Sequence, residues 1–335
     1  MSAAPLLEVA DLNVRLAVPH GRLHVVNNVD LQVGRGETLC LVGESGCGKS
    51  MVALSLMRLL PRVAGWSAGH LRLDGQDLSV LDDRAFAAIP GNRIAMIFQD
   101  PMTAFNPVMP LGEQLFEGFL RHRRGDRRQA REKALHLLDR LNVPAAARRL
   151  KQYPHELSGG LRQRMMIAMA LMCDPALVIA DEPTTALDVT IQALTLRLLA
   201  ELQREMDLGL ILVTHDLGLV SRMADRVAVM YAGQIVETAD RRSLFAEPRH
   251  PYTRGLIDCV PVPGRHRAGG RLGTIEGSVP MMLEGVPGCR FANRCAFVRG
   301  ACRAQAPPVR QAGGRSWRCI WEGLPASEDA LQGAS

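Results

Sequence analysis

The chain has 335 residues, of which 47% are hydrophobic but only 4% are aromatic. This length favours one large domain with an extension, and an apolar content drawn mainly from Ala, Leu, Val, Ile and Met suits parallel strands in an α/β protein. The longest apolar run is broken by Asp174 and Pro175, so it falls short of the roughly 18–20 residues of a membrane span. The N-terminus has no basic segment, which argues against a signal peptide. We expect a cytoplasmic protein, or one that reaches a membrane only through partners.

The net charge of +6 is concentrated towards the C-terminus. Residues 1–240 hold 26 Lys and Arg against 27 Asp and Glu, whereas residues 241–335 hold 14 Arg, no Lys and 7 acidic residues. A basic tail is typical of some proteins that bind nucleic acid or anionic lipid. Here the Arg residues are scattered among Pro, Gly and Cys without interleaved aromatic residues. We therefore do not expect nucleic acid as a partner.

In chain order, alternating apolar residues predict strands at 6–12 and 23–33, with a loop between them. Further strands are predicted at 35–42, 70–73, 93–98, 176–180, 210–214 and 226–231, of which 35–42, 93–98 and 176–180 are expected to be buried. Helices are predicted at 82–89, within the charged stretch 111–141, and at 161–173, 190–207 and 217–224, while residues 100–110 predict a proline-rich loop. Strands alternating with helices indicate a largely parallel sheet that binds ligands at the carboxyl ends of its strands.

The stretch LVGESGCGKS, residues 41–50, links a buried strand to an apolar helix. Gly43, four residues, and then Gly48, Lys49 and Ser50 form a complete phosphate-binding pattern. Glycines let backbone N–H groups wrap an anion, and the N-terminus of the following helix favours the same anion. Lys49 is expected to reach the β- and γ-phosphates of a nucleotide, and the Ser50 hydroxyl to ligate Mg²⁺.

Further polar motifs stand at the ends of predicted elements. Gln99 ends one strand, Asp181 and Glu182 end another, and His215 ends a third. Asp181 is placed to hold Mg²⁺ through water, and Glu182 to polarise an attacking water. The segment LSGGLRQR opens a helix with two glycines, which makes a second N-terminus suited to an anion.

In this order, the motifs closely resemble the ATP-binding subunits of ABC transporters, over residues 6 to about 264. The resemblance implies that Gln99 is the Q-loop residue and a Mg²⁺ ligand, Glu182 the catalytic glutamate, Asp188 part of the D-loop and His215 the switch histidine. It implies a signature motif that acts on the ATP of a partner subunit, formed by Leu157, Ser158, Gly159, Gly160 and Leu161. The nucleotide-binding loop would comprise Gly43, Glu44, Ser45, Gly46, Cys47, Gly48, Lys49, Ser50 and Met51.

Two features depart from the family pattern. Leu161 stands where Gln is commonest in the signature, and we expect little loss from that change. Residues 1–65 contain no Phe, Tyr or Trp, although the family usually stacks an aromatic residue on adenine from this region. His20, Leu23 and His24 remain open as alternatives.

The resemblance implies a P-loop ABC ATPase domain over residues 6–240, with a parallel-sheet core, an antiparallel N-terminal β subdomain and a helical subdomain at about 100–172. Residues 241–335 would form a small extension that contains cysteines. One phosphate loop and one signature per chain imply a dimer, with a second copy or with a related ATPase.

The residues in and around the motifs narrow the resemblance to one subfamily of ABC transporters. IFQDPMTAFNPV, YPHELSGG, VMYAGQIVE and RHPYTRGLI resemble the dipeptide D-type ATPases of bacterial dipeptide/oligopeptide importers. Such a chain powers peptide import from the cytoplasmic face of the inner membrane, with two permease subunits and, indirectly, a peptide-binding protein. Alternatives are an importer of nickel or glutathione, or a soluble ABC ATPase that acts on ribosomes or DNA.

Four of the eight cysteines lie in the tail, at Cys289, Cys295, Cys302 and Cys319. A small basic segment with little hydrophobic pattern suggests a metal staple, and a cytosolic location argues against disulfides. The spacing of two cysteines separated by two residues, which is usual in zinc sites, is absent. Four thiolates suit a [4Fe–4S] cluster. The resemblance also implies such a cluster. Zinc and free thiols stay as alternatives. Nearby Arg290, Arg294, Arg303 and Arg318 are expected to offset thiolate charge.

Overall fold

A computed structural model describes residues 4–19, 21–184, 189–260, 274–281, 283–285 and 287–324. Contacts divide the chain into two compact units. The first unit takes its described residues from Met1–Glu8, Gln32–Glu37 and Arg72–Leu212, and the second from Val9–Leu31, Thr38–Leu71 and Val213–Ser335. The predicted domain boundary at residue 240 remains a prediction.

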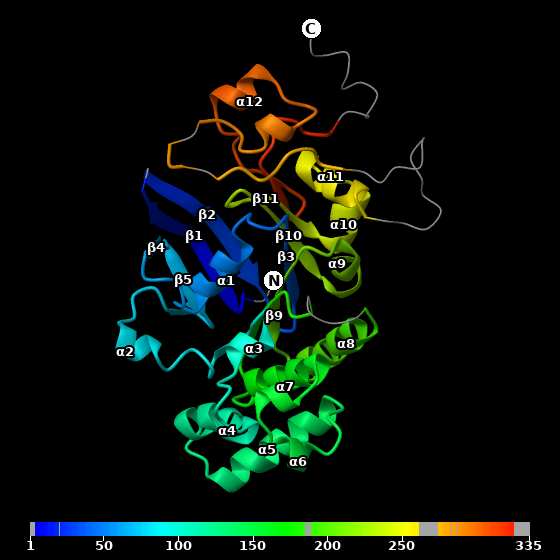
Figure 1. Cartoon of the computed structure of the whole chain (residues 1–335). Coiled ribbons are helices and arrows are strands. Elements are labelled where there is room, and N and C mark those ends of the chain that lie inside the picture. Colours follow the sequence, from blue (N-terminus) through cyan, green and yellow to red (C-terminus); the bar gives the residue numbers. More distant parts are fainter. Residues whose placement is uncertain are drawn as a thin grey trace. The chain divides into compact units, whose positions relative to one another are not determined.

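The second unit contains an antiparallel N-terminal part, as the resemblance implied (Figure 1). Strand β1 (Leu7–Val18) lies between β2 (Gly21–Val33) and β5 (His70–Leu73), and it also pairs antiparallel with β4 (Ala64–Ser67). At the end of β5, Arg72 and Leu73 belong to the first unit and pair antiparallel with β6 (Gln76–Asp77). Both long strands extend further towards each other than the sequence predicted, so only two residues connect them.

The second unit also contains a five-stranded run, in the order β12-β13-β11-β10-β3. Strand β3 (Thr38–Val42) is parallel to β10 (Arg226–Tyr231), and β10 turns through Ala232 and Gly233 into antiparallel β11 (Gln234–Asp240). Both turn residues have positive φ, 44° and 85°, as a tight two-residue hairpin requires. The chain returns to this sheet at its C-terminal end, where β13 (Arg315–Trp317) pairs with β11 and with β12 (Arg310–Ala312).

The remaining elements of the second unit are short helices. They are α1 (Lys49–Leu56), α9 (Leu217–Met223), α10 (Arg241–Ala246), α11 (Pro251–Asp258), η2 (Ala292–Arg294) and α12 (Gly300–Ala304). Asp216, Asp240 and His250 cap α9, α10 and α11 by accepting hydrogen bonds from backbone N–H groups of the first turn, which satisfies donors that a helix leaves unpaired.

The first unit places strand β8 (Leu177–Asp181) between β7 (Ile94–Ile97) and β9 (Gly209–Thr214). Strands β7 and β8 are parallel, and every residue of both is buried. Continuous burial explains why these strands read as unbroken apolar runs in the sequence. The sheet core is therefore built by the segments that the sequence predicted.

The helices of the first unit are α2 (Asp83–Phe86), α3 (Pro101–Ala104), α4 (Leu111–His122), α5 (Arg127–Arg140), α6 (Ala146–Arg149), η1 (Pro154–Glu156), α7 (Gly159–Leu171) and α8 (Val189–Glu205). Helices α4, α5 and α7 contact one another, and α3 packs on α7 (Figure 1). The predicted loop 100–110 begins with α3, because Asp100 caps the helix and Pro101 occupies its first position.

Candidate functional site

The phosphate-binding pattern folds as a turn between β3 and α1, with Gly43, Gly46 and Gly48 at φ 155°, 80° and 108°. A Cβ on Gly43 would lie 2.2 Å from the carbonyl oxygen of Met230, and one on Gly48 would lie 2.4 Å from that of Val25. Both glycines are therefore required by close backbone packing as well as by their φ angles. The loop is further fixed by the Gly233 N–H, which donates to the carbonyl of Cys47 at 2.8 Å.

Lys49 folds back over this loop. Its Nζ donates to the carbonyls of Gly43 at 2.8 Å and Glu44 at 3.0 Å, and only 5% of the residue is exposed. Ser45, Gly46 and Ser50 are exposed, and Met51 is half-buried. Cys47 is buried, and burial raises the pKa of its thiol, so it packs as a small neutral side chain instead of a reactive thiolate.

Two residues that the sequence did not connect to the loop contact it at Glu44. The Tyr252 hydroxyl accepts a hydrogen bond from the Glu44 N–H at 2.8 Å. The Arg294 guanidinium pairs with the Glu44 carboxylate at 2.6 and 2.9 Å. Arg294 was expected to offset thiolate charge, and its ion pair with Glu44 corrects that expectation.

In the first unit, the acidic pair stands at the end of β8. Asp181 is 6% exposed at the strand end, and Glu182 comes next with a positive φ of 44°. The Gln99 side-chain amide donates to the Glu182 carboxylate at 3.1 Å. The structure therefore brings together two of the three residues expected to be catalytic.

The predicted signature begins directly after η1 and ends in the first turn of α7. Leu157 is buried, and Ser158 is the exposed N-cap of α7 with no side-chain capping hydrogen bond. Gly159, Gly160 and Leu161 are half-buried in the first turn. A Cβ on Gly160 would lie 2.9 Å from the Ile191 side chain, so this turn packs closely against α8.

The remaining predicted residues fall in different places. His215 follows β9 and is exposed, in the same unit as the phosphate loop. Asp188 and His20 lie outside the described residues. His24 is 9% exposed and its Nε2 lies 2.8 Å from Asn13 Oδ1, so its ring is buried and does not offer a face to adenine. Leu23 forms an antiparallel bridge with Leu283.

The four tail cysteines line one small cavity of about 10 Å³, together with His250, Phe291 and Trp321. Burial is the main cause that raises the pKa of Cys289, of Cys295 to about 12 and of Cys319 to about 11, and neighbouring cysteines add to it. Within the residues that the structure describes, no group of three or more His, Cys, Asp or Glu side chains is arranged to hold a metal ion. The four cysteines thus share one cavity, but in the conformation described they do not form a metal-ligand set.

The expected role of the arginines near these cysteines is not what the contacts show. Arg290 donates to the backbone carbonyls of His24 and Ala232, and Arg318 to that of Ile235. Arg303 donates to the Asn293 side chain. Burial lowers the pKa of Arg290 to about 10. Arg290 and Arg318 thus tie the tail to β2, to β11 and to the turn between β10 and β11.

Among the described helices, none has the length and apolar character needed to cross a bilayer.

Residues 26–185 match the family model of ABC transporters, and residues 236–302 match that of the oligopeptide/dipeptide transporter C-terminal region. A putative peptide import ATP-binding protein of Brucella melitensis is 48% identical, covering 97% of this chain and all of the relative. Another from Brucella abortus is 48% identical, covering 99% of both chains.

Solved structures of ATP-binding cassettes are also similar to this chain. A dimeric ATP-binding cassette in a post-hydrolysis state with ADP and Pi has a TM-score of 0.63 at 25% identity, covering 70% of this chain and 99% of its own. The cbiO1 protein of Clostridium perfringens, part of the ABC transporter complex cbiONQ, has a TM-score of 0.60 at 25% identity over 72% of this chain and 91% of its own.

Proposed function

The chain belongs to the ATP-hydrolysing subunits of ABC transporters, and from this premise we propose that it powers the import of dipeptides or oligopeptides across the bacterial inner membrane. The match of residues 236–302 to the oligopeptide/dipeptide transporter C-terminal region carries the choice of substrate class. The printed names of the Brucella relatives support the same class.

Nucleotide binding is assigned to residues 43–51. Their glycine geometry leaves backbone N–H groups to bind phosphate oxygens, and Lys49 is close enough to exchange its carbonyl partners for phosphates. Mg²⁺ supplies charge neutralisation between the β- and γ-phosphates. Ser50, Gln99 and Asp181 offer the hydroxyl, amide and carboxylate oxygens that this ion prefers.

Hydrolysis is assigned to Glu182 as the group that polarises the attacking water, with His215 as a contact to the γ-phosphate. The hydrogen bond from Gln99 to Glu182 supports a role for Gln99 in orienting that carboxylate. Asp188 is proposed to act in the D-loop.

We propose that two ATPase subunits work together, because the chain carries one phosphate loop and one signature. Ser158 and the glycines after it begin α7, so their N–H groups form the positive end of a helix suited to a partner's γ-phosphate. The partner is either a second copy or a related ATPase. Two permease subunits would hold the pair at the cytoplasmic face of the membrane, and a peptide-binding protein would act through them.

For the tail we propose a [4Fe–4S] cluster bound by Cys289, Cys295, Cys302 and Cys319, with zinc as the alternative. The support is that the four thiols line one cavity. The cavity has room for only about one water molecule, so cluster binding requires the thiols to move apart.

The cofactor is tested by anaerobic purification followed by iron, sulfide and zinc analysis. We expect about four irons per chain, since four thiolates suit a four-iron cluster, and their loss in the Cys289→Ser and Cys302→Ser variants. One zinc per chain would establish the alternative, and a metal-free chain would contradict both.

Transport is tested with the chain, its partner ATPase and its permeases in proteoliposomes that contain ATP. We expect a labelled dipeptide, delivered with its binding protein, to be taken up, and uptake to be lost with Lys49→Ala. Uptake of nickel or of glutathione without dipeptide would replace the substrate class while keeping the ATPase. ATP hydrolysis stimulated by ribosomes or DNA, and not by permeases, would contradict the importer assignment.

A further inference from the structure

Glu44, the second residue of the phosphate loop, is held by an ion pair from the C-terminal segment. Arg294 Nη1 lies 2.6 Å from Glu44 Oε2, and Nη2 lies 2.9 Å from Oε1. The contact is bidentate, the geometry in which a guanidinium binds a carboxylate most strongly. The side chain of Arg294 is 7% exposed and that of Glu44 is 27% exposed, so water screens this pair less than a surface pair.

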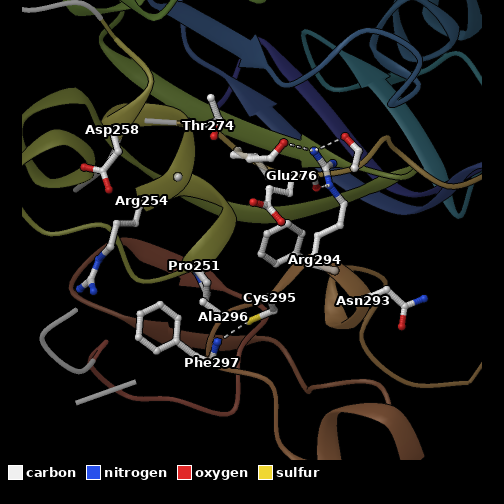
Figure 2. A pocket seen from close by; sticks show the side chains of 14 residues that line it. Pro251, Arg254, Asp258, Thr274, Glu276, Asn293, Arg294, Cys295, Ala296 and Phe297 are labelled. Carbon is white, nitrogen blue, oxygen red and sulfur yellow. Dashed lines mark hydrogen bonds between the residues drawn. The ribbon is translucent and has the colours of Figure 1, made fainter. Parts of the chain in front are cut away.

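Arg294 is itself fixed from behind (Figure 2). Its Nε donates to the Glu276 carbonyl at 2.8 Å, and Nη2 also donates to the carbonyls of Ile275 and Gly277 at 3.2 Å. The guanidinium carbon lies 5.7 Å from the centre of the Tyr231 ring. These contacts orient the guanidinium independently of Glu44. Forming the ion pair therefore costs little additional side-chain entropy.

The backbone of the same residue is held by a second contact. The Glu44 N–H donates to the Tyr252 hydroxyl at 2.8 Å, and Tyr252 is fully buried. Its ring lies 4.6 Å from that of Tyr231 and 5.4 Å from that of Phe291, centre to centre. An aromatic cluster thus fixes the hydroxyl, and both the main chain and the side chain of Glu44 are constrained.

We propose that Arg294 and Tyr252 are positioning residues that hold the phosphate loop in its nucleotide-binding shape. Two effects act in the same direction. A loop already in its bound conformation loses less entropy on binding, and a carboxylate paired with Arg294 repels the triphosphate less than an unpaired one. The proposal rests on the proposed function in one respect, namely that the loop binds ATP. The C-terminal segment thereby becomes part of the ATP-binding machinery.

The test is the equilibrium affinity for a fluorescent ATP analogue with Mg²⁺, in Arg294→Gln, Arg294→Lys and Tyr252→Phe. We expect Arg294→Gln to bind about tenfold more weakly, because a buried charge-assisted contact is lost. Arg294→Lys and Tyr252→Phe should each cost about threefold, because one keeps the charge without the bidentate fit and the other removes only one acceptor.

The matched control is Arg303→Gln, which removes an arginine of the same segment that donates to Asn293 and makes no contact with Glu44; its affinity should stay unchanged. A double-mutant cycle with Glu44→Gln separates positioning from mere folding. If Arg294 acts through Glu44, then Arg294→Gln should change affinity less than about twofold in the Glu44→Gln background. Full additivity would overturn the proposal.

For each variant, thermal unfolding is measured without nucleotide beside the affinity, so that a loss of binding can be told from a loss of folding. Folded Arg294→Gln and Tyr252→Phe proteins with wild-type affinity would overturn the proposal. A wild-type chain that binds no ATP would instead contradict the proposed function. If Arg294→Gln does not fold, Arg294→Lys and Tyr252→Phe decide the matter by the same affinity criterion.

Discussion

Glu182 stands in a backbone conformation that few residues with side chains adopt. Glu182 follows the buried end of β8 with a φ of 44°, and its carboxylate accepts a hydrogen bond from Gln99. Such a conformation costs of the order of 1 kcal/mol and persists where surrounding structure imposes it. Here it turns the carboxylate towards Gln99, the residue with which it is proposed to act.

We expect Glu182→Gln to retain ATP binding and to lose at least about a hundredfold in hydrolysis, since general base catalysis contributes that much. The variant should also accumulate as a closed dimer when ATP is present. Phosphate release and size-exclusion chromatography measure the two effects. Glu205→Gln, which removes an exposed carboxylate paired with Arg140, is the control, and ordinary turnover in Glu182→Gln would contradict the assignment.

His24 makes stability depend on pH. Burial, followed by the charges of Arg15 and Arg290, lowers the pKa of His24 below 6.5. Because the unfolded chain binds this proton more readily than the folded chain, stability falls as pH drops below about 6.5. The melting temperature of the wild type should therefore fall more between pH 7 and pH 5.5 than that of His24→Gln, which can still donate to Asn13. Parallel curves for the two proteins would contradict this account.

At the scale of single residues, the sequence predicted which polar side chains stand at the ends of buried strands. Gln99, Asp181 and Glu182 follow apolar runs, and parallel strands bring their carboxyl ends to one edge. It did not predict that Tyr252 and Arg294 contact the phosphate loop, because their partner Glu44 lies 208 and 250 residues away in the sequence. Pairing across such separations depends on tertiary packing, which local spacing does not encode.

The turn from β3 to α1 shows how two glycines of one motif differ in their physical roles. Gly48 combines a φ of 108° with a backbone carbonyl 2.4 Å from any added Cβ. Gly46 has a φ of 80° and nothing within 4 Å of that position. Conformational strain applies to both, whereas a steric clash applies only to Gly48.

We therefore expect Gly46→Ala to lower the free energy of unfolding by about 1 kcal/mol, the cost of a left-handed residue. Gly48→Ala should cost more, by about 1–3 kcal/mol beyond that, because backbone atoms must shift to relieve the overlap. Urea unfolding of the nucleotide-free chain measures both. Equal losses would show that the contact with Val25 does not constrain the turn.

Continuously buried strands were predictable from the sequence, whereas several short and partly exposed strands were not. Strands β7, β8 and β10 are continuous apolar runs, so their sequence alone marks them. Strands β4, β6, β12 and β13 have two to four residues each and alternate or expose their side chains. Such strands exist because a neighbour supplies hydrogen bonds, and that neighbour is remote in sequence.

At the scale of the whole chain, the tail is joined to the sheet of the second unit. The sequence predicted a segment without a core, stapled by metal. The structure instead pairs β13 with β11, with Trp317 opposite Glu237, and leaves Trp317 7% exposed. The Trp317 indole N–H donates to the Trp321 carbonyl, and Arg249 lies over its ring. Sheet pairing and aromatic packing thus hold the tail in addition to any bound cofactor.

We expect Trp317→Ala to lower the free energy of unfolding by about 3–5 kcal/mol, as for other buried aromatic truncations. Trp66→Ala is the control, because Trp66 is only half-buried in β4, and its cost should be clearly smaller. Chemical denaturation of the metal-free proteins measures both values. A similar loss from the two substitutions would mean that β13 adds little to stability.

The pairing of β11 with β13 also has a consequence for biosynthesis. Strand β11 ends at Asp240, and its partner begins at Arg315. A ribosome adding about 5–20 residues per second needs roughly 4–15 s to make the intervening segment. During that interval the edge of β11 has no partner from the tail, and an unpaired edge can join a strand of another nascent chain. Translation speed through residues 241–314 is therefore expected to influence how much of this protein reaches its native state, and chaperones that cover strand edges should matter most in that window.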